Sequence, residues 1–251
     1  MSNPILSEKT FENARQARAG TGTNSGEVMT LKGTINKSIL LFITLLVPAA
    51  WIWWKMGGNP ETAGGLGGWI IGSAILGFVL SLIIVFKKSW APVLAPLYAA
   101  VEGVFLGLVS MVFEYTYPGI VMEAVGVTLL VFAAMLVAYR TGLLRATPMF
   151  TKVIVMATLG VLLFYLINMV VTWITGNNWY AGSSTLSIVV SAVVAGIAAF
   201  NLILDFNMIE EGSKSGFPKY MEWFCAFGLM VTIVWLYLEV LRLLAKLSRR
   251  D

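Results

Sequence analysis

Seven continuous apolar runs constrain this chain more than any other feature of its sequence. They cover residues 36–56, 66–86, 91–113, 119–139, 151–174, 183–209 and 221–244. A helix needs roughly 20 apolar residues to cross the hydrocarbon core of a bilayer. Strands of a membrane barrel would instead alternate polar and apolar residues over about 10 positions. The runs therefore predict an all-α integral membrane protein, a bundle of seven transmembrane helices.

The composition supports this class and excludes others. Hydrophobic residues make up 58% of the chain and charged residues 12%, against about 25% charged residues in typical soluble domains. The chain has no His and one Cys, Cys225, which excludes His-based catalysis, His metal sites and an internal disulfide. We therefore expect no enzyme activity and no bound cofactor. We attribute the net charge of +4 to membrane topology rather than to nucleic-acid binding.

The first 34 residues differ from the rest of the chain. They are rich in Ser, Thr, Asn and Gly, and such a segment has too little apolar surface to offset its ordering entropy. We predict a disordered, polar cytoplasmic tail over 1–34 and one seven-helix transmembrane domain over 35–251. No cleavage site follows the first apolar run, so this run is expected to stay as the first helix.

Basic residues predict the orientation. With the N-terminus in the cytoplasm, twelve Lys and Arg residues fall on the cytoplasmic side and only Lys55 falls outside, as the positive-inside rule requires. The twelve are Lys9, Arg15, Arg18, Lys32, Lys37, Lys87, Lys88, Arg140, Arg145, Lys152, Lys214 and Lys219. Four late basic residues, between 242 and 250, conflict with a C-terminus outside. We prefer seven crossings; the alternative is a re-entrant last segment that returns to the cytoplasm.

Small residues spaced by four predict where helices approach one another, because membrane helices pack through residues that let backbones come close. Gly68 and Gly72 are such a pair in the second predicted helix, and Gly103 and Gly107 form another in the third. We expect these faces to pack within the bundle. A monomer is favoured over a dimer formed through the same faces.

Glu102 is the charge deepest inside a predicted span. Ionisable groups in the hydrocarbon are costly and are functional candidates by default. No cation is near it on its own helix, although Tyr98 is one turn away, so burial favours the neutral carboxyl. We expect Glu102 to face the bundle with a polar partner on another helix. Its functional interpretation is an ion or proton stop along a pore.

Asp205 lies inside the apolar run of the sixth predicted helix, with Asn201 one turn earlier on the same face. Desolvation and nearby like charges both favour its protonated form. Acidic residues follow at the same mouth: Glu210, Glu211 and Glu222. They would concentrate hard cations, which makes Asp205 a candidate metal ligand, although no metal site is defined. The alternative is a solvated rim neutralised by nearby lysines.

The seventh predicted helix carries a polar stripe at a spacing of three to four residues. The stripe consists of Cys225, Gly228, Thr232, Trp235, Glu239 and Arg242. A polar stripe on an apolar helix should face the interior of the bundle. Glu239 and Arg242 are three residues apart and can form an ion pair within the helix.

Three segments of the sequence resemble the bacterial branch of the Bax inhibitor-1 family, also called transmembrane Bax inhibitor motif proteins. They are YAAVEGVFLG at 98–107, NLILDFNMIE at 201–210, and the last helix with MEW at 221–223 and WLYLEVLRLL at 235–244. The resemblance covers about residues 30–248 and is most specific in the last third.

The resemblance implies a seven-helix bundle with the last helix central and a pH-sensitive calcium leak. In such leaks two aspartates near the cytoplasmic ends of the sixth and seventh helices share a proton, as closely placed like charges do. Asp205 matches the first aspartate, and Thr232 stands at the second position. Glu102, Glu222 and Glu239 are candidates for a second carboxylate. The arginine that closes the pore in relatives has no counterpart, since residues 66–86 contain no Arg.

Two functions from different classes follow. The first is a channel in the lipid bilayer that passes calcium or protons and is gated near Asp205. The second is a non-conducting regulator that binds other membrane proteins, such as a membrane protease. With the resemblance, the tail predicts a multi-pass protein of a bacterial inner membrane.

Overall fold

The computed structural model describes residues 28–56, 66–176, 180 and 182–249. Most of these residues belong to seven long helices. They are α2 (Leu31–Met56), α3 (Leu66–Phe86), α4 (Ala91–Thr116), α5 (Ile120–Arg140), α6 (Pro148–Thr175), α7 (Thr185–Lys214) and α8 (Met221–Ser248). All seven are long and apolar enough to cross a membrane, which confirms the predicted all-α class and the number of spans. Of the predicted tail over 1–34, residues 1–27 lie outside the described residues.

The start of α6 differs from the prediction because the helix begins at a polar cap that precedes the apolar run. α6 begins at Pro148 rather than at residue 151, because the Thr147 hydroxyl accepts a hydrogen bond from the backbone N–H of Phe150 at 3.2 Å. A threonine cap followed by proline is a common helix start. Gly176 ends the helix in the left-handed conformation, with φ of 67°.

α8 is the most buried of the seven helices. Two thirds (67%) of its most apolar stretch is buried, against 11% for α6. This agrees with a last helix that is central in the bundle. α8 also runs without a break from Met221 to Ser248, so the structure does not support the alternative of a re-entrant last segment.

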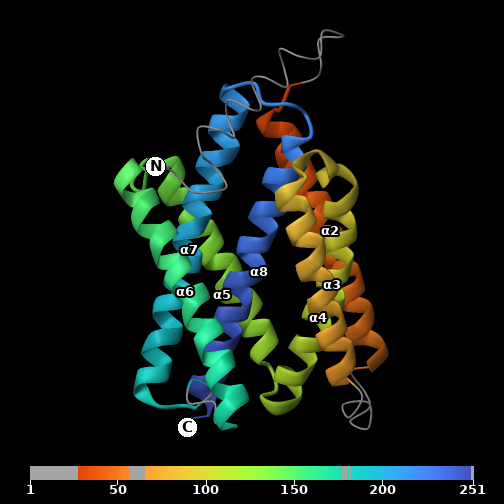
Figure 1. The fold of residues 1–251 in the computed structure, drawn as a ribbon, viewed down its shortest axis with the longest axis vertical. Coiled ribbons are helices and arrows are strands. Elements are labelled where there is room, and N and C mark those ends of the chain that lie inside the picture. Colours follow the sequence, from red (N-terminus) through yellow and green to blue (C-terminus); the bar gives the residue numbers. More distant parts are fainter. Residues whose placement is uncertain (1–27, 57–65, 177–179, 181, 250–251) are drawn as a thin grey trace. The chain divides into compact units, whose positions relative to one another are not determined.

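The described chain forms two compact units, and α7 and α8 each contribute to both. The first unit contains α2, α3, the short 3₁₀ helix η2 (Lys88–Trp90) and α4, with residues 208–230 (orange and yellow in Figure 1, with part of the blue). The second contains residues 117–207 and 231–249, which are α5, α6, most of α7 and the later part of α8.

In the first unit α4 packs against α2 through two glycines. A Cβ atom on Gly103 would overlap the backbone carbonyl of Leu45, and one on Gly107 would lie 3.0 Å from the Cα of Ala49. A larger side chain at either position would push the two helices apart. At Gly68 and Gly72 a Cβ would meet no described atom within 4 Å. Their spacing by four makes a smooth strip on α3, but no described backbone lies against it.

Aromatic side chains hold the helices of the second unit together. The ring of Phe206 on α7 lies 5.8 Å from that of Phe132 and 5.7 Å from that of Tyr139, both on α5. Phe150 on α6 meets Phe200 on α7 edge to face at 5.8 Å. These contacts fix α7 against both neighbours at the level of Asp205, the residue next to Phe206.

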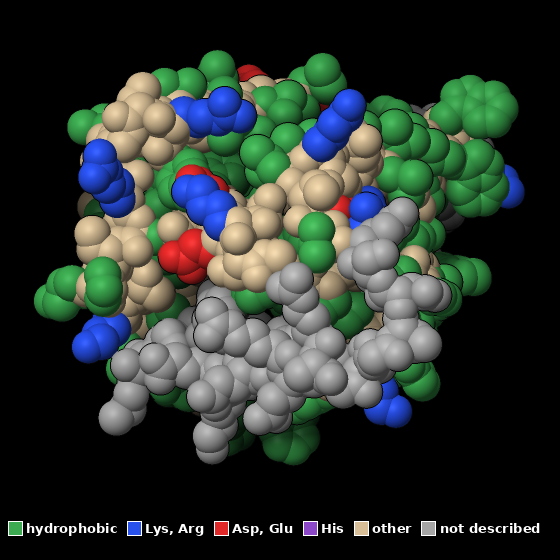
Figure 2. Space-filling view, turned by 90° about the horizontal axis from the view of Figure 1, so that it is seen from above, with side chains coloured by type: hydrophobic (Ala, Val, Ile, Leu, Met, Phe, Trp, Pro, Cys, Tyr) green, Lys and Arg blue, Asp and Glu red, His purple; other side chains and the backbone are tan. Residues whose placement is uncertain are grey.

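Lysines from three separate segments of the first unit gather at the start of α8. The ammonium groups of Lys37 and Lys88 lie over the rings of Trp223 and Phe224, at 5.5 and 5.1 Å from the ring centres. Lys219 lies 3.6 Å from the carboxylate of Glu222. Figure 2 looks onto this end and shows its Lys and Arg side chains among apolar ones. Three segments predicted to share the cytoplasmic side therefore share one end of this unit.

Candidate functional site

Asp205 on α7 faces α8 within the second unit. Its carboxylate forms a hydrogen bond with the side chain of Thr232, which is itself buried. The second carboxylate oxygen, Oδ2, is buried and has no hydrogen-bond partner among the described residues. A buried carboxylate oxygen without a donor is costly as an anion and far less costly when protonated or when a cation lies against it.

Asn201, one turn before Asp205, does not extend this pair. Its side-chain amide donates to the hydroxyl of Thr158 on α6 and to the backbone carbonyl of Ile197, both at 2.9 Å. The amide therefore joins α7 to α6. In the described part of the chain, no group of three or more Asp, Glu or Cys residues is arranged to hold a metal ion.

Glu102 lies in the first unit and is buried, as predicted for a residue that faces the bundle. Its hydrogen bond is with Tyr98, one turn earlier on α4. Within the first unit this bond is to a residue of the same helix, whereas the sequence led us to expect a polar partner on another helix. The reason is geometric: the tyrosine hydroxyl already reaches the carboxyl, and the facing residue on α3 is Gly77, where a Cβ would lie 3.2 Å from Glu102 Oε2.

Glu222 is fully buried at the first turn of α8 and joins it to the start of α2. It accepts hydrogen bonds from the backbone N–H of Thr30 at 2.8 Å and from the hydroxyl of Thr30 at 3.0 Å. It also forms an ion pair with Lys37. Its carboxyl leaves no space for a side chain at Gly33. Glu222 is therefore held as a charged carboxylate at the N-terminus of α2, where the helix dipole favours a negative charge.

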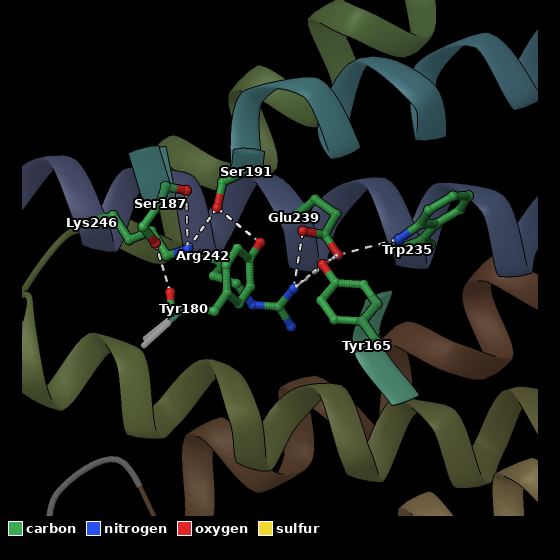
Figure 3. Close-up of polar contacts among 8 residues, drawn as sticks. All are labelled: Tyr165, Tyr180, Ser187, Ser191, Trp235, Glu239, Arg242 and Lys246. Atoms are coloured by element: carbon green, nitrogen blue, oxygen red, sulfur yellow. Dashed lines mark hydrogen bonds and ion pairs between the residues drawn. The ribbon is translucent and has the colours of Figure 1, made fainter. Parts of the chain in front are cut away.

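Glu239 belongs to a third group of polar residues, near the C-terminal end of α8 (Figure 3). Its Oε1 accepts hydrogen bonds from Tyr165 Oη at 2.6 Å and from Trp235 Nε1 at 3.2 Å. Arg242 Nη1 donates to both carboxylate oxygens, at 2.9 and 3.0 Å, and to Tyr165 Oη at 2.7 Å. The ion pair predicted within the helix is present, and Tyr165 ties it to α6.

Lys246, which the sequence did not single out as a site residue, lies in the same region and is buried. Its ammonium donates to Ser191 Oγ at 2.8 Å and to the carbonyl of Ser187 at 3.3 Å, and it lies 3.4 Å from the centre of the Tyr180 ring. The Tyr180 hydroxyl in turn lies 2.9 Å from Ser191 Oγ. The polar stripe of α8 continues to this residue at a spacing of four, which is the signal that could have found it.

Arg242 and Lys246 therefore lie against side chains of α6 and α7 rather than in a loop. Positive-inside counting applies to loops and helix ends, and an Arg that pairs with Glu239 adds no net charge there. Arg242 and Lys246 are therefore weak evidence against a C-terminus on the outside of the membrane.

Asp205 and Thr232 lie together among the six predicted site residues, and Asn201 and Glu239 bind other partners in the same unit. Glu102 and Glu222 belong to the other unit. Along α8, Glu239 is seven residues from Thr232, or about 10 Å.

Seven membrane-crossing helices that carry buried acids on α4, α7 and α8 define a multi-pass helical membrane protein. A family model described as Bax inhibitor 1 like matches residues 3–249. The chain therefore belongs to the Bax inhibitor-1-like family, as the three sequence segments predicted. Neither a curated protein nor a solved structure gave a match.

Proposed function

We propose that this protein is a cation leak, for calcium or protons, that responds to pH through Asp205. The observation that carries the proposal is the Asp205 carboxylate, which has one oxygen bonded to Thr232 and the other buried without a described partner. A buried carboxylate with an oxygen that lacks a donor is stabilised when it binds a proton or a cation. A structural carboxylate whose oxygens already have partners would lose those interactions.

The mechanism follows from the two protonation states. At low pH the neutral acid keeps its hydrogen bond to Thr232 and holds α7 against α8, so the path is closed. At higher pH the carboxylate attracts cations to this level of the bundle, and flux rises. Thr232 cannot share a proton as a second acid would, so the pH response is that of one titrating group rather than of a coupled pair.

Flux of calcium into liposomes, measured across pH for wild type and Asp205→Asn, tests the proposal. The substitution keeps the shape of the side chain and removes its titration. We expect flux that rises with pH in wild type and no pH dependence in Asp205→Asn. Glu123→Gln is the matched control, because Glu123 is an exposed acid of the same unit. An unchanged pH dependence in Asp205→Asn means that Asp205 is not the switch.

The second candidate function is a non-conducting regulator that binds other membrane proteins. It is favoured by the other buried acids, because Glu102, Glu222 and Glu239 each have a hydrogen-bond or ion-pair partner. A pore lined by acids would leave several of them open to the path. Absence of flux at every pH in wild-type liposomes would favour this function.

For either function we propose an N-terminus in the cytoplasm of a bacterial inner membrane. Two observations support this orientation. Lys37, Lys88 and Lys219 gather at one end of the first unit, and Arg242 and Lys246 at the end of α8 are held by side chains of α6 and α7.

A further inference from the structure

The three residues before α2, Val28–Thr30, run along the turn that connects α7 to α8 at residues 215–220, and we call them the strap. Val28 forms an isolated antiparallel β-bridge with Pro218. The backbone N–H of Met29 donates to the carbonyl of Phe217 at 2.7 Å. All these residues belong to the first unit. The strap therefore adds backbone pairing to the turn between the last two helices.

The side chain of Met29 anchors the strap to the last turn of α7. It is 1% exposed. A Cβ atom on Gly212 would lie 2.9 Å from Met29 Sδ and 3.1 Å from the ring of Phe217, so the missing side chain at Gly212 makes room for the methionine. The flexible thioether of a methionine fills such a gap well, and its many atom contacts hold it there.

Thr30 anchors the other end of the strap to the first turn of α8. Its backbone N–H and its hydroxyl both donate to Glu222 Oε1, at 2.8 and 3.0 Å. Three consecutive residues thus contact α7, the turn and α8. While the strap is seated, it holds the end of α7 and the start of α8 at one separation.

The same two helices carry the contact between Asp205 and Thr232. α7 runs without a break through Asp205 to Gly212, and α8 from Glu222 through Thr232. The distances along the helices are about 10 Å on α7 and about 15 Å on α8. Rigid helices transmit a displacement over such lengths. Two contacts therefore join one pair of helices at two heights, and loosening one lowers the cost of loosening the other.

We propose that Met29 is a positioning residue for the contact between Asp205 and Thr232, and that the seated strap holds the leak closed. Release of the strap lets the ends of α7 and α8 part, weakens the contact at Asp205 and raises flux. A short segment outside the helices opens more readily than the helices do, so the strap is the part that moves. The effect on flux rests on the proposed function, whereas the coupling between strap and contact does not.

A disulfide between Val28→Cys and Pro218→Cys traps the strap in its seat. Residues paired across antiparallel strands have Cα atoms about 4.5–5.5 Å apart, a distance that a disulfide spans. Calcium flux into liposomes is measured at the upper end of the pH range, before and after reduction. We expect at least about fivefold lower flux in the oxidised protein, the low end of ordinary coupling between sites. Val28→Cys alone should show no change, because Cys225 is fully buried.

The rate of disulfide formation in the purified double-cysteine protein measures the coupling without any flux. Thr232→Val removes the hydrogen bond to Asp205 and should slow disulfide formation about fivefold, because coupling between two sites is reciprocal. Thr128→Val is the matched control and should leave the rate unchanged. Thr128 is a buried threonine of the same unit as Thr232, and its hydroxyl donates to the carbonyl of Ala124 at 2.7 Å.

Two substitutions of Met29 test the residue itself. Met29→Ala should raise flux about fivefold at the lower end of the pH range, and Met29→Leu, which fills a similar volume, should behave as wild type. Equal flux before and after reduction overturns the proposal, and so do equal rates of disulfide formation in Thr232→Val and Thr128→Val. Slower disulfide formation in Thr232→Val, with no flux in wild type at any pH, supports the coupling and overturns the leak.

Discussion

The carboxylate of Glu222, at the start of α8, accepts a hydrogen bond of 2.8 Å from the backbone N–H of Thr30, although 192 residues separate the two. The same carboxylate pairs with Lys37, less than two turns into α2. The contact closes the first unit by joining its first helix to its last segment.

Glu222→Gln should therefore destabilise the protein by about 3 kcal/mol, because it removes the charge that Lys37 and the start of α2 need. Unfolding in mixed micelles with increasing denaturing detergent measures the loss. Glu210→Gln is the control: Glu210 pairs with Lys214 in an exposed position, and such pairs are worth at most about 1 kcal/mol. Similar losses in both variants would contradict a special role for Glu222.

Gly103→Ala should destabilise the protein by about 1–3 kcal/mol, because the new Cβ overlaps the Leu45 carbonyl and forces α4 away from α2. Gly68→Ala makes the same chemical change where no described atom lies within 4 Å, and it should be neutral within about 0.5 kcal/mol. The midpoints of the same detergent unfolding curves compare the two. If both alanine variants unfold alike, the close approach of α4 and α2 is not a source of stability.

Tyr165→Phe should cost about 1–2 kcal/mol, because it removes a hydrogen bond to the buried Glu239 and one from Arg242. Tyr115→Phe removes a hydroxyl from a residue that is 67% exposed and should have no effect. Thermal unfolding of the purified variants provides the measurement. A harmless Tyr165→Phe would show that the ion pair does not depend on its contact with α6.

Single cysteines should report an N-terminus inside. Cys225 is fully buried, so the background from the native thiol is low. Leu143→Cys, in the segment between α5 and α6, should be protected from a membrane-impermeant maleimide added to whole cells, whereas Leu186→Cys at the start of α7 should react. Both leucines are exposed, which makes the pair matched. The reverse pattern of labelling would invert the topology.

The lengths of the apolar runs predicted the seven helices correctly. A bilayer requires a minimum length of each spanning helix, and that length can be read from one continuous stretch of sequence. Gly103 and Gly107 were predicted for the same kind of reason. The spacing of Gly68 and Gly72 is identical, but whether a helix covers a glycine depends on the tertiary arrangement, which the spacing does not encode.

The partners of buried charges were the least predictable part of the site. Asp205 was a candidate because of its place in an apolar run, and the position of Thr232 came from a family resemblance. Nothing in the sequence relates Glu222 to Thr30, since the contact is non-local and involves a backbone N–H. In the sequence Lys246 is one of several basic residues near the end of the last helix. Its burial depends on contacts with Ser191 and Tyr180, which lie more than 50 residues earlier in the chain, so the local sequence does not predict it.

The polar contacts of Glu239, Arg242 and Lys246 near the end of α8 have a consequence for biogenesis. Synthesis proceeds from the N-terminus, so Tyr165, Tyr180 and Ser191 are made before α8. When α8 enters the membrane, Glu239, Arg242 and Lys246 are each costly to insert alone. They meet groups that are already present, and α6 and α7 therefore act as a template for the insertion of the last helix.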